Sequence, residues 1–344
     1  MITFRWFGPA DPIPLRHIRQ IPAVRGIVGA LFDIPVGEPW PLDRIARLID
    51  EVEDAGLGLE VIESIPVHED IKLGKPTRDR FIESYCKSIG ALGSAGVPVL
   101  CYNFMPVFDW TRTELSRTLA DGSTALAYDD ARLAAIDLSG GTGDLPGWAA
   151  AYSRSELDAL LRAYRSVSES QLWDNLAYFL ERVVPAASAA KVRMALHPDD
   201  PPWSIFGLPR IITDGPALRR VTEIVPDPAN GITFCTGSLG VKAENDLPAI
   251  VRSLSSRIHF AHCRNIKRTG PKSFEESPHP TEHGDVDMRA VLSALRETKF
   301  SGPIRSDHGR MIWGEQGRPG YGLHDRALGA MYLHGLWEGL SASA

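Results

Sequence analysis

Short apolar segments alternate with longer amphipathic segments along most of the chain. Leu42, Ile45, Leu48, Ile49 and Val52 illustrate the second kind, because they recur at the three- and four-residue spacing of one helix face. The apolar segments predict eight strands, which are Thr3–Phe7, Gly26–Leu31, Gly58–Ile62, Pro98–Phe104, Arg193–His197, Gly231–Thr236, Arg257–His262 and Pro303–Asp307. The amphipathic segments predict seven helices, which are Leu42–Ala55, Thr77–Ser94, Glu169–Ala189, Ala217–Ile224, Leu247–Leu254, Met288–Arg296 and Leu323–Leu336.

The alternation predicts an α/β fold, because a helix between two strands lets them lie parallel in one sheet. Eight such repeats are the number that closes a (β/α)8 TIM barrel, so we predict this barrel as a single domain over residues 1–344. A doubly wound open sheet is the alternative. Asp43 and Asp287 near helix starts, and Gly56 and Gly96 after helix ends, fit these boundaries.

The chain is longer than a barrel needs. A typical TIM barrel takes about 250 residues, which leaves an excess of roughly 90. We expect most of it in an insertion or cap region, residues 105–168, with one short helix at Ser153–Tyr164. The connections Pro198–Thr213, Ile266–Asp285 and Arg310–Gly322 are also long. All four follow a strand and precede its helix, which is the face that carries barrel active sites.

Composition narrows the class of protein. With 344 residues, 44% hydrophobic and 23% charged, the sequence is typical of a folded globular protein. A net charge of −6 argues against a general nucleic-acid binder. No apolar run approaches the ~20 residues of a membrane span, and no signal peptide is visible at the start. The four cysteines are expected to be free thiols or metal ligands, so we predict a cytoplasmic enzyme.

Polar side chains that can bind metal stand at the ends of four consecutive expected strands. They are His197, Cys235, His262 and Asp307, each about one βα unit from the next. Because successive barrel strands are neighbours, these side chains converge above the barrel and form a plausible shell for a divalent cation. Taken singly, each has a simpler interpretation, such as a packed histidine or a small buried thiol. His259 and Cys263 are expected to point to the other side of the strand.

Other residues on the same face are candidates for contact with substrate. Glu63 and Asn103 end two strands, where they could bind hydroxyl groups or support the metal shell. Trp6 lies in the first strand and is a further candidate. Arg264 and Arg305 could neutralise an anionic substrate, and so could Arg310 and Lys267, although Lys267 better fits a surface charge.

Two residues could transfer protons. His308, beside Asp307, is a candidate general base, and Tyr321, in a glycine-flanked loop, is a candidate proton donor. The glycine run at Gly140–Gly143 is better explained as a turn than as a phosphate site, since no Lys-Ser/Thr follows it.

Several runs with rare residue combinations resemble the mannonate dehydratase family, from Phe4–Trp6 almost to the end of the chain. They are Cys101–Arg112 (CYNFMPVFDWTR), His197–Pro202 (HPDDPP), Thr233–Gly240 (TFCTGSLG), Gly284–Met288 (GDVDM), Asp307–Arg310 (DHGR) and Pro319–Tyr321 (PGY). One departure is Ser306, where the family pattern leads us to expect proline before the Asp-His pair.

The resemblance implies a metal-dependent TIM barrel that dehydrates D-mannonate to 2-keto-3-deoxy-D-gluconate in hexuronate breakdown. It implies that His197, Cys235, His262 and Asp307 are the metal ligands, that the metal is Mn²⁺, and that the protein is a homodimer or higher homo-oligomer. A thiolate ligand by itself would favour Zn²⁺ or Fe²⁺. The expected partner is a small sugar acid, with no nucleic acid and no membrane.

In this reaction a base removes the proton at C2 and the hydroxyl at C3 departs. We assign the base to His308 and the acid to Tyr321, and the two roles could be exchanged. One alternative is a sugar isomerase of the xylose-isomerase type, whose sites consist mainly of carboxylates around two metals. A non-catalytic sugar-acid-binding protein is the other alternative.

Overall fold

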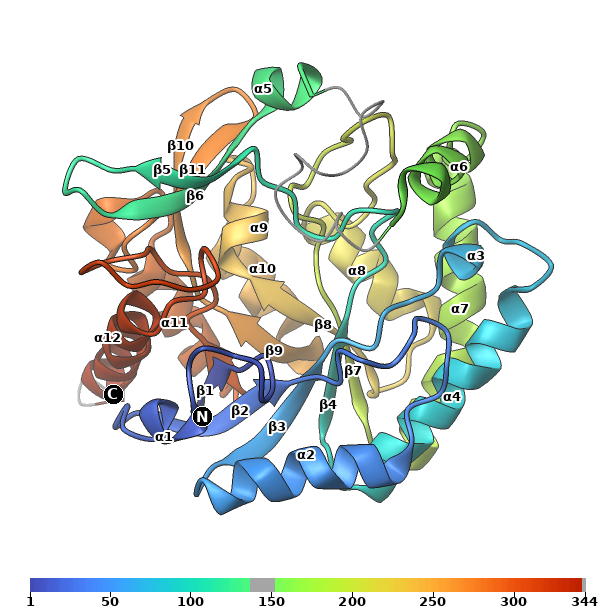
Figure 1. The fold of residues 1–344 in the computed structure, drawn as a ribbon, viewed down its shortest axis with the longest axis horizontal. Coiled ribbons are helices and arrows are strands. Elements are labelled where there is room, and N and C mark those ends of the chain that lie inside the picture. The colour runs from blue at the N-terminus through green and yellow to red at the C-terminus, as the bar shows by residue number, and fades with distance from the viewer. Residues whose placement is uncertain (137–151, 342–344) are drawn as a thin grey trace.

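The computed structural model of the chain describes residues 1–136 and 152–341, and its centre is a closed barrel of eight parallel strands. Their order around the barrel is β1-β12-β9-β8-β7-β4-β3-β2 (Figure 1). The strands are β1 (Ile2–Arg5), β2 (Val24–Gly29), β3 (Gly58–Glu63), β4 (Val99–Tyr102), β7 (Arg193–Leu196), β8 (Asn230–Cys235), β9 (Ile258–His262) and β12 (Ile304–Arg305). All eight overlap the predicted strands, so the barrel is confirmed and the open sheet is wrong.

Helices follow the strands as the periodicity predicts. The seven expected ones are α2 (Leu42–Asp54), α4 (Arg78–Ser94), α7 (Glu169–Ala190), α8 (Gly215–Ile224), α10 (Leu247–Leu254), α11 (Met288–Glu297) and α12 (His324–Ser341). Their boundaries follow local chemistry. Asp287 caps the first turn of α11, and Gly56 and Gly96 adopt the left-handed conformation after α2 and α4.

The inside of the barrel is a small apolar cluster, separate from the main core. Six buried side chains from five strands form it, namely Val28, Val61, Val99, Cys101, Ala195 and Phe260. The main core lies between the strands and the surrounding helices. Because side chains alternate along a strand, the residue two positions after an inward one also points inward, one layer nearer the carboxyl ends. This rule decides which side chains reach the mouth of the barrel.

A second sheet was not predicted. Four antiparallel strands pair in the order β10-β11-β6-β5. They are β5 (Glu114–Thr118), β6 (Thr124–Asp129), β10 (Asn265–Gly270) and β11 (Ser273–Ser277). The first two lie in the insertion after β4 and the last two in the connection after β9, and the two hairpins lie side by side (Figure 1). We name these four strands the accessory sheet.

Short helices complete the described chain. They are α1 (Leu15–Ile18), α3 (Glu69–Lys72), α5 (Asp130–Ala134), α6 (Arg154–Tyr164), α9 (Thr236–Gly240), η4 (Ser255–Arg257) and η5 (Thr281–His283). The predicted helix of the insertion is α6, and Ser153 with Glu156 forms a capping box at its start. The glycine run Gly140–Gly143 lies outside the described residues. None of the helices in the described segments is both long and apolar enough to cross a bilayer.

Candidate active site and metal centre

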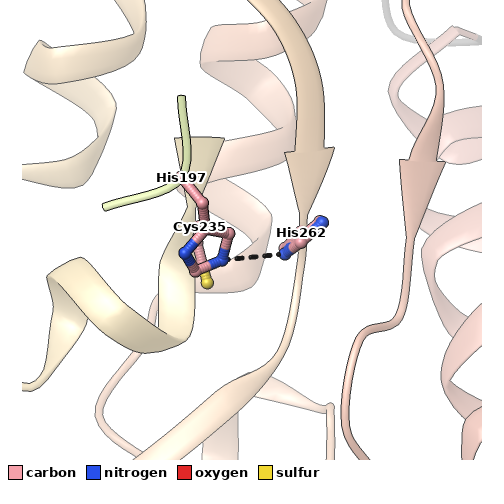
Figure 2. Close-up of side chains that lie close together, drawn as sticks. All are labelled: His197, Cys235 and His262. Atoms are coloured by element: carbon pink, nitrogen blue, oxygen red, sulfur yellow. Dashed lines mark hydrogen bonds between the residues drawn. The ribbon is translucent and has the colours of Figure 1, made fainter. Parts of the chain in front are cut away.

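Three of the proposed ligands meet at the carboxyl ends of neighbouring strands. His197 follows β7, Cys235 ends β8 and His262 ends β9 (Figure 2). One ligand atom from each lies within 4.8 Å of the others, and His197 Nε2 is 3.2 Å from His262 Nδ1. Cys235 and His262 are direct lateral partners in the β8–β9 ladder, which places both side chains on the same side of the wall. The backbone pairing of the barrel therefore assembles this group.

The chemistry of these atoms fits a bound cation. His197 Nδ1 lies 2.6 Å from the carbonyl oxygen of Pro198, so it donates its proton there and leaves a lone pair on Nε2. The sulfur of Cys235 accepts hydrogen bonds from the backbone N–H and the hydroxyl of Ser238, at 3.4 and 3.2 Å. His262 Nε2 is buried without a hydrogen-bond partner among the described residues, and its nearest carboxylate contact is Glu63 at 3.7 Å. Nitrogen and sulfur donors of this kind suit a divalent transition metal.

Asp307 stands beside this group. Its carboxylate oxygens lie 3.8 Å from the sulfur of Cys235 and 3.8 Å from His262 Nδ1. Burial alone would raise the pKa of Asp307, but Arg305, His308, His262 and Arg264 outweigh it and hold the pKa well below its usual range. The carboxylate is therefore ionised. Its backbone φ of +59° is uncommon outside glycine.

The protonation of the two histidines also fits a metal site. Burial, with the charge of Arg305, keeps the pKa of His262 well below its usual value, so this ring is neutral. Burial alone would lower the pKa of His197, but Cys235, Glu63 and Asp307 raise it to about 9. The negative groups that attract a proton to His197 would equally attract a cation, since metal and proton compete for the same lone pair.

A second set of possible ligands shares His262. Glu63 and Cys101 also bring ligand atoms within 4.8 Å of one another and of this histidine. Burial raises the pKa of Cys101 well above its usual value, and its sulfur accepts a hydrogen bond from the hydroxyl of Thr233 at 3.2 Å. A protonated thiol is a poor ligand, so the set with Cys235 fits a metal better.

His308 and Tyr321 are in contact, as the assignment of both to proton transfer requires. His308 Nε2 is 2.8 Å from the hydroxyl of Tyr321. Burial raises the pKa of Tyr321 above its ordinary value, so its hydroxyl keeps its proton. Trp110, from the insertion, packs edge-on to His308 with ring centroids 5.3 Å apart. All three side chains line a cavity of about 310 Å³ at the mouth of the barrel.

Behind His308 lies a buried ionic network that the sequence did not reveal. Glu276, on β11 of the accessory sheet, and Arg264 both lie 2.6 Å from His308 Nδ1. Arg112 binds Glu276 at 2.9 Å and Asp200 through two nitrogens at 2.9 and 3.0 Å. Burial would raise the pKa of Glu276, but His308, Arg264 and Arg112 lower it, so this carboxylate is ionised. His308 Nδ1 thus either donates to Glu276 or accepts from Arg264.

The predicted arginines have different surroundings. Arg264 lines the cavity but is engaged by Asp200 at 2.6 Å and by Asp307 at 3.3 Å. Arg305 also lines it and contacts Glu63 and Asp307 at 3.0 and 2.8 Å. Arg310 pairs instead with Asp325 and Asp121 and is not among the lining residues. Lys267 is exposed, as expected.

Glu63 and Asn103 line the cavity, as expected from their places at strand ends, but Trp6 does not. Trp6 is buried in the main core, and the residue before it, Arg5, lines the cavity instead. Arg5 is the lateral partner of Val28, which points into the barrel. The alternation along β1 could have identified Arg5, because Trp6 at the next position must face the other way.

The two residues expected to turn away are outside the cavity for different reasons. Cys263 packs in the main core. His259 lies at the start of β9, where the pairing with β8 shifts by one residue, and its ring packs against Gly231. Its Nδ1 is 2.7 Å from the carbonyl oxygen of Met194. His259 is therefore kept from the site by its place along the strand, and not by the simple alternation that we predicted.

Comparisons of the sequence and the structure with known proteins point to one family. A family model described as D-mannonate dehydratase (UxuA) matches residues 1–344. Mannonate dehydratase 2 of Halalkalibacterium halodurans is 53% identical over 99% of both chains, and the mannonate dehydratase of Streptococcus uberis is 52% identical over 100% of this chain and 99% of its own. The crystal structure of mannonate dehydratase from Streptococcus suis serotype 2 superposes with a TM-score of 0.93 at 48% identity, over 99% of this chain and 95% of that one. A D-allulose 3-epimerase from Methylomonas sp. shares the fold at 15% identity and a TM-score of 0.57, over 98% of this chain and 97% of its own.

Proposed function

The chain belongs to the D-mannonate dehydratase family, and from this premise we propose that it converts D-mannonate to 2-keto-3-deoxy-D-gluconate and water. The observation that carries the proposal is that the His197–Cys235–His262 group and the His308–Tyr321 pair lie at the same barrel mouth. A dehydratase acting on a polyhydroxy acid needs both a cationic centre for the acid and groups that move protons. The sugar isomerase alternative is not favoured, because the neighbours of that class share only the fold.

We propose that His197, Cys235, His262 and Asp307 hold the metal. The sulfur of Cys235 lies 3.8 Å from a carboxylate oxygen of Asp307, which supports this set, because a divalent cation bound there would take the place of the thiol proton and would have two negatively charged ligands. When bound, a divalent cation withdraws charge from the substrate carboxylate and its neighbouring oxygen. We propose Mn²⁺ as the metal, with Fe²⁺ or Zn²⁺ as alternatives because of the sulfur ligand.

The proton transfers are assigned to the chain's own residues. With the Nδ1 proton of His308 donated to Glu276, Nε2 has the lone pair and accepts the hydroxyl proton of Tyr321 at 2.8 Å. When that hydroxyl turns to the leaving group, the same lone pair takes the proton from C2 of the substrate. The electron pair of that C–H bond first moves into the substrate carboxylate, giving an enediolate that can also regain a proton at C2. It then forms the C2–C3 double bond as the C3–O bond breaks, and the hydroxyl leaves as water with a proton from Tyr321. The enol loses the proton of its C2 hydroxyl, gains a proton at C3 and becomes the ketone. The 2.8 Å contact returns the proton from His308 to Tyr321.

The function is tested by incubating the purified, manganese-loaded protein with a panel of aldonic acids. We expect a 2-keto-3-deoxy product from D-mannonate. An inactive but metal-loaded protein that binds the acid without exchange at C2 in deuterated water would instead indicate a sugar-acid-binding protein.

The roles of the two proton-transferring residues are separable by isotope exchange. We expect His308→Asn to lose both product formation and hydrogen exchange at C2, by roughly 10²- to 10⁴-fold. Tyr321→Phe should lose product formation but keep the exchange at C2, because the base remains. The reverse pattern would exchange the two roles, and near-full turnover by metal-loaded His308→Asn would remove His308 from the mechanism.

We also propose that the enzyme acts in hexuronate breakdown in the cytoplasm, as a homodimer or higher homo-oligomer. All four cysteines are free, and a cysteine ligand requires a reduced sulfur, which favours a reducing compartment.

A further inference from the structure

Arg5 presents a buried positive charge that nothing in the described chain neutralises. It ends β1, lines the cavity and is only 5% exposed. Its Nη1 atom is buried without a hydrogen-bond partner, and across residues 1–136 and 152–341 no carboxylate lies within ion-pair distance of its guanidinium. The rings of Phe7 and Phe32 lie 4.9 and 5.4 Å from the guanidinium carbon. A buried charge without a counter-ion is unfavourable, so an anion bound beside Arg5 would be stabilised.

The neighbouring strand adds to the same positive region. Arg305 lies on β12, which pairs with β1, and its charge further lowers the pKa of Arg5, which burial already lowers. Glu63 and Asp307 occupy only Nη2 of Arg305, and its Nε and Nη1 are buried without partners. The two guanidinium groups thus hold three donors without acceptors beside the same cavity.

Among the described residues, no carboxylate forms an ion pair with both arginines. Glu63, the nearest acidic influence on Arg5, is committed to Arg305 at 3.0 Å and to His262 at 3.7 Å. The aromatic faces of Phe7 and Phe32 offer weak cation–π attraction, which does not replace an ion pair or accept the free N–H groups. The missing acceptor must therefore come from a molecule in the cavity.

We propose that Arg5, together with the free nitrogens of Arg305, binds the carboxylate of the substrate and selects acids over uncharged sugars. The inference rests on the proposed function, which supplies a carboxylate at C1. A guanidinium matches a carboxylate with two parallel hydrogen bonds. Because Arg305 also contacts Asp307 at 2.8 Å, a carboxylate held here lies beside the proposed metal ligands. Aldonic acids fit this subsite, whereas aldoses, lactones and aldonamides leave it without an anion.

The test compares an acid with its neutral amide. 3-Deoxy-D-mannonate and 3-deoxy-D-mannonamide lack the leaving hydroxyl, so neither can be dehydrated, and their binding to the manganese-loaded protein is measurable by calorimetry. We expect Arg5→Gln to weaken binding of the acid about 10- to 100-fold and binding of the amide less than threefold. Arg25→Gln, which changes an exposed arginine on β2, is the matched control and should alter neither.

A second measurement separates ligand binding from a purely structural role. Without ligand, Arg5→Gln should melt at or above the temperature of the wild type, because it removes an unpaired buried charge. A marked loss of thermal stability, equal losses for acid and amide, or unchanged acid binding would each overturn the proposal. Arg5→Met supplies a second variant should the glutamine protein fold poorly. Turnover of D-mannonate by the wild type is scored independently, so failure of the proposed function is distinguishable from failure of this subsite.

Discussion

The barrel and the accessory sheet hold residues of the candidate site in place in different ways. The barrel places Cys235 and His262 by strand pairing, in a ladder that continues from the apolar interior below them. The accessory sheet places Glu276 by its pairing with Ile266 of β10, and ion pairs with Arg112 and Arg264, from segments far apart in the chain, hold its carboxylate. Backbone pairing therefore fixes both positions, but only the carboxylate of Glu276 is also held by a network of buried charges. Changes in the two regions should have different consequences.

The largest effect is expected in the barrel. Cys235→Ala should abolish metal binding and lower turnover by roughly 10³-fold or more, because several kcal/mol of charge stabilisation are lost. The fold should remain, since the ladder does not depend on the sulfur. Metal content by mass spectrometry and turnover are the measurements.

Cys101→Ala is the matched control, because it removes the thiol of the second possible ligand set, which lines the cavity. It should keep the metal and most of the activity. If Cys101→Ala lost the metal and Cys235→Ala kept it, the ligand set would be the one with Glu63 and Cys101.

An intermediate effect is expected in the accessory sheet. Glu276→Gln removes the negative charge that pairs with Arg112 and Arg264 and accepts from His308 Nδ1, and it should slow turnover about 10- to 100-fold, as expected for one charge-assisted hydrogen bond. It should also lower the free energy of unfolding by about 3–5 kcal/mol, because buried charges lose their partner. Metal content should stay unchanged, unlike in Cys235→Ala. Urea unfolding, turnover and metal content together measure this contrast.

Glu275→Gln is the control on the same strand, since Glu275 contacts Arg117 only at 3.8 Å on a partly exposed surface. It should be close to the wild type in all three measurements. If Glu276→Gln and Glu275→Gln had the same turnover and the same free energy of unfolding, the buried network would not support His308.

The smallest effect concerns the two ends of β9, where His262 lies among the proposed metal ligands and His259 lies at the start of the strand. Burial lowers the pKa of His259 to about 4. The unfolded chain therefore binds a proton near pH 6.5 that the folded chain takes up only near pH 4. The resulting stability is fully present above about pH 6.5 and is lost as the pH falls toward 4.

The variant His259→Gln removes this titration. Between pH 7.5 and pH 5 the wild type should lose about 2 kcal/mol more unfolding free energy than the variant, measured by urea denaturation. The loss of metal at low pH is common to both proteins and cancels in the difference. Identical pH slopes would show that the His259 ring is not held neutral by burial.

Much of the barrel could be predicted from sequence because its signals are local. Each strand is a short apolar run, and each helix has its own amphipathic period, as in Leu42–Asp54. The proposed ligands could be predicted because a polar residue at the carboxyl end of an apolar barrel strand lies at the barrel mouth. Arg5 was not predicted, and Trp6 was predicted in its place, although the alternation along β1 puts these two side chains on opposite faces of the strand.

The accessory sheet could not be predicted in the same way. Its strands are short, and β5 is partly exposed along its length, so its apolar signal is weak. More importantly, β6 pairs with β11, whose residues come 144 to 148 positions later, and no local pattern indicates so distant a partner. In the sequence, Glu276 is one of two adjacent acidic residues in the run Ser273–Ser277, and only the pairing shows that it faces His308.

The pairing of β6 with β11 also sets an order of events during synthesis. The hairpin β5–β6 leaves the ribosome well before β11, and until then one edge of β6 has unsatisfied backbone donors and acceptors. Closing the loop that joins Arg112 to Glu276, 164 positions apart, is slow because it must overcome a large entropy cost. His308 therefore gains its charged support only near the end of folding, when most of the barrel already exists. A nascent chain that stalls before β11 carries an open strand edge and is exposed to aggregation at that point.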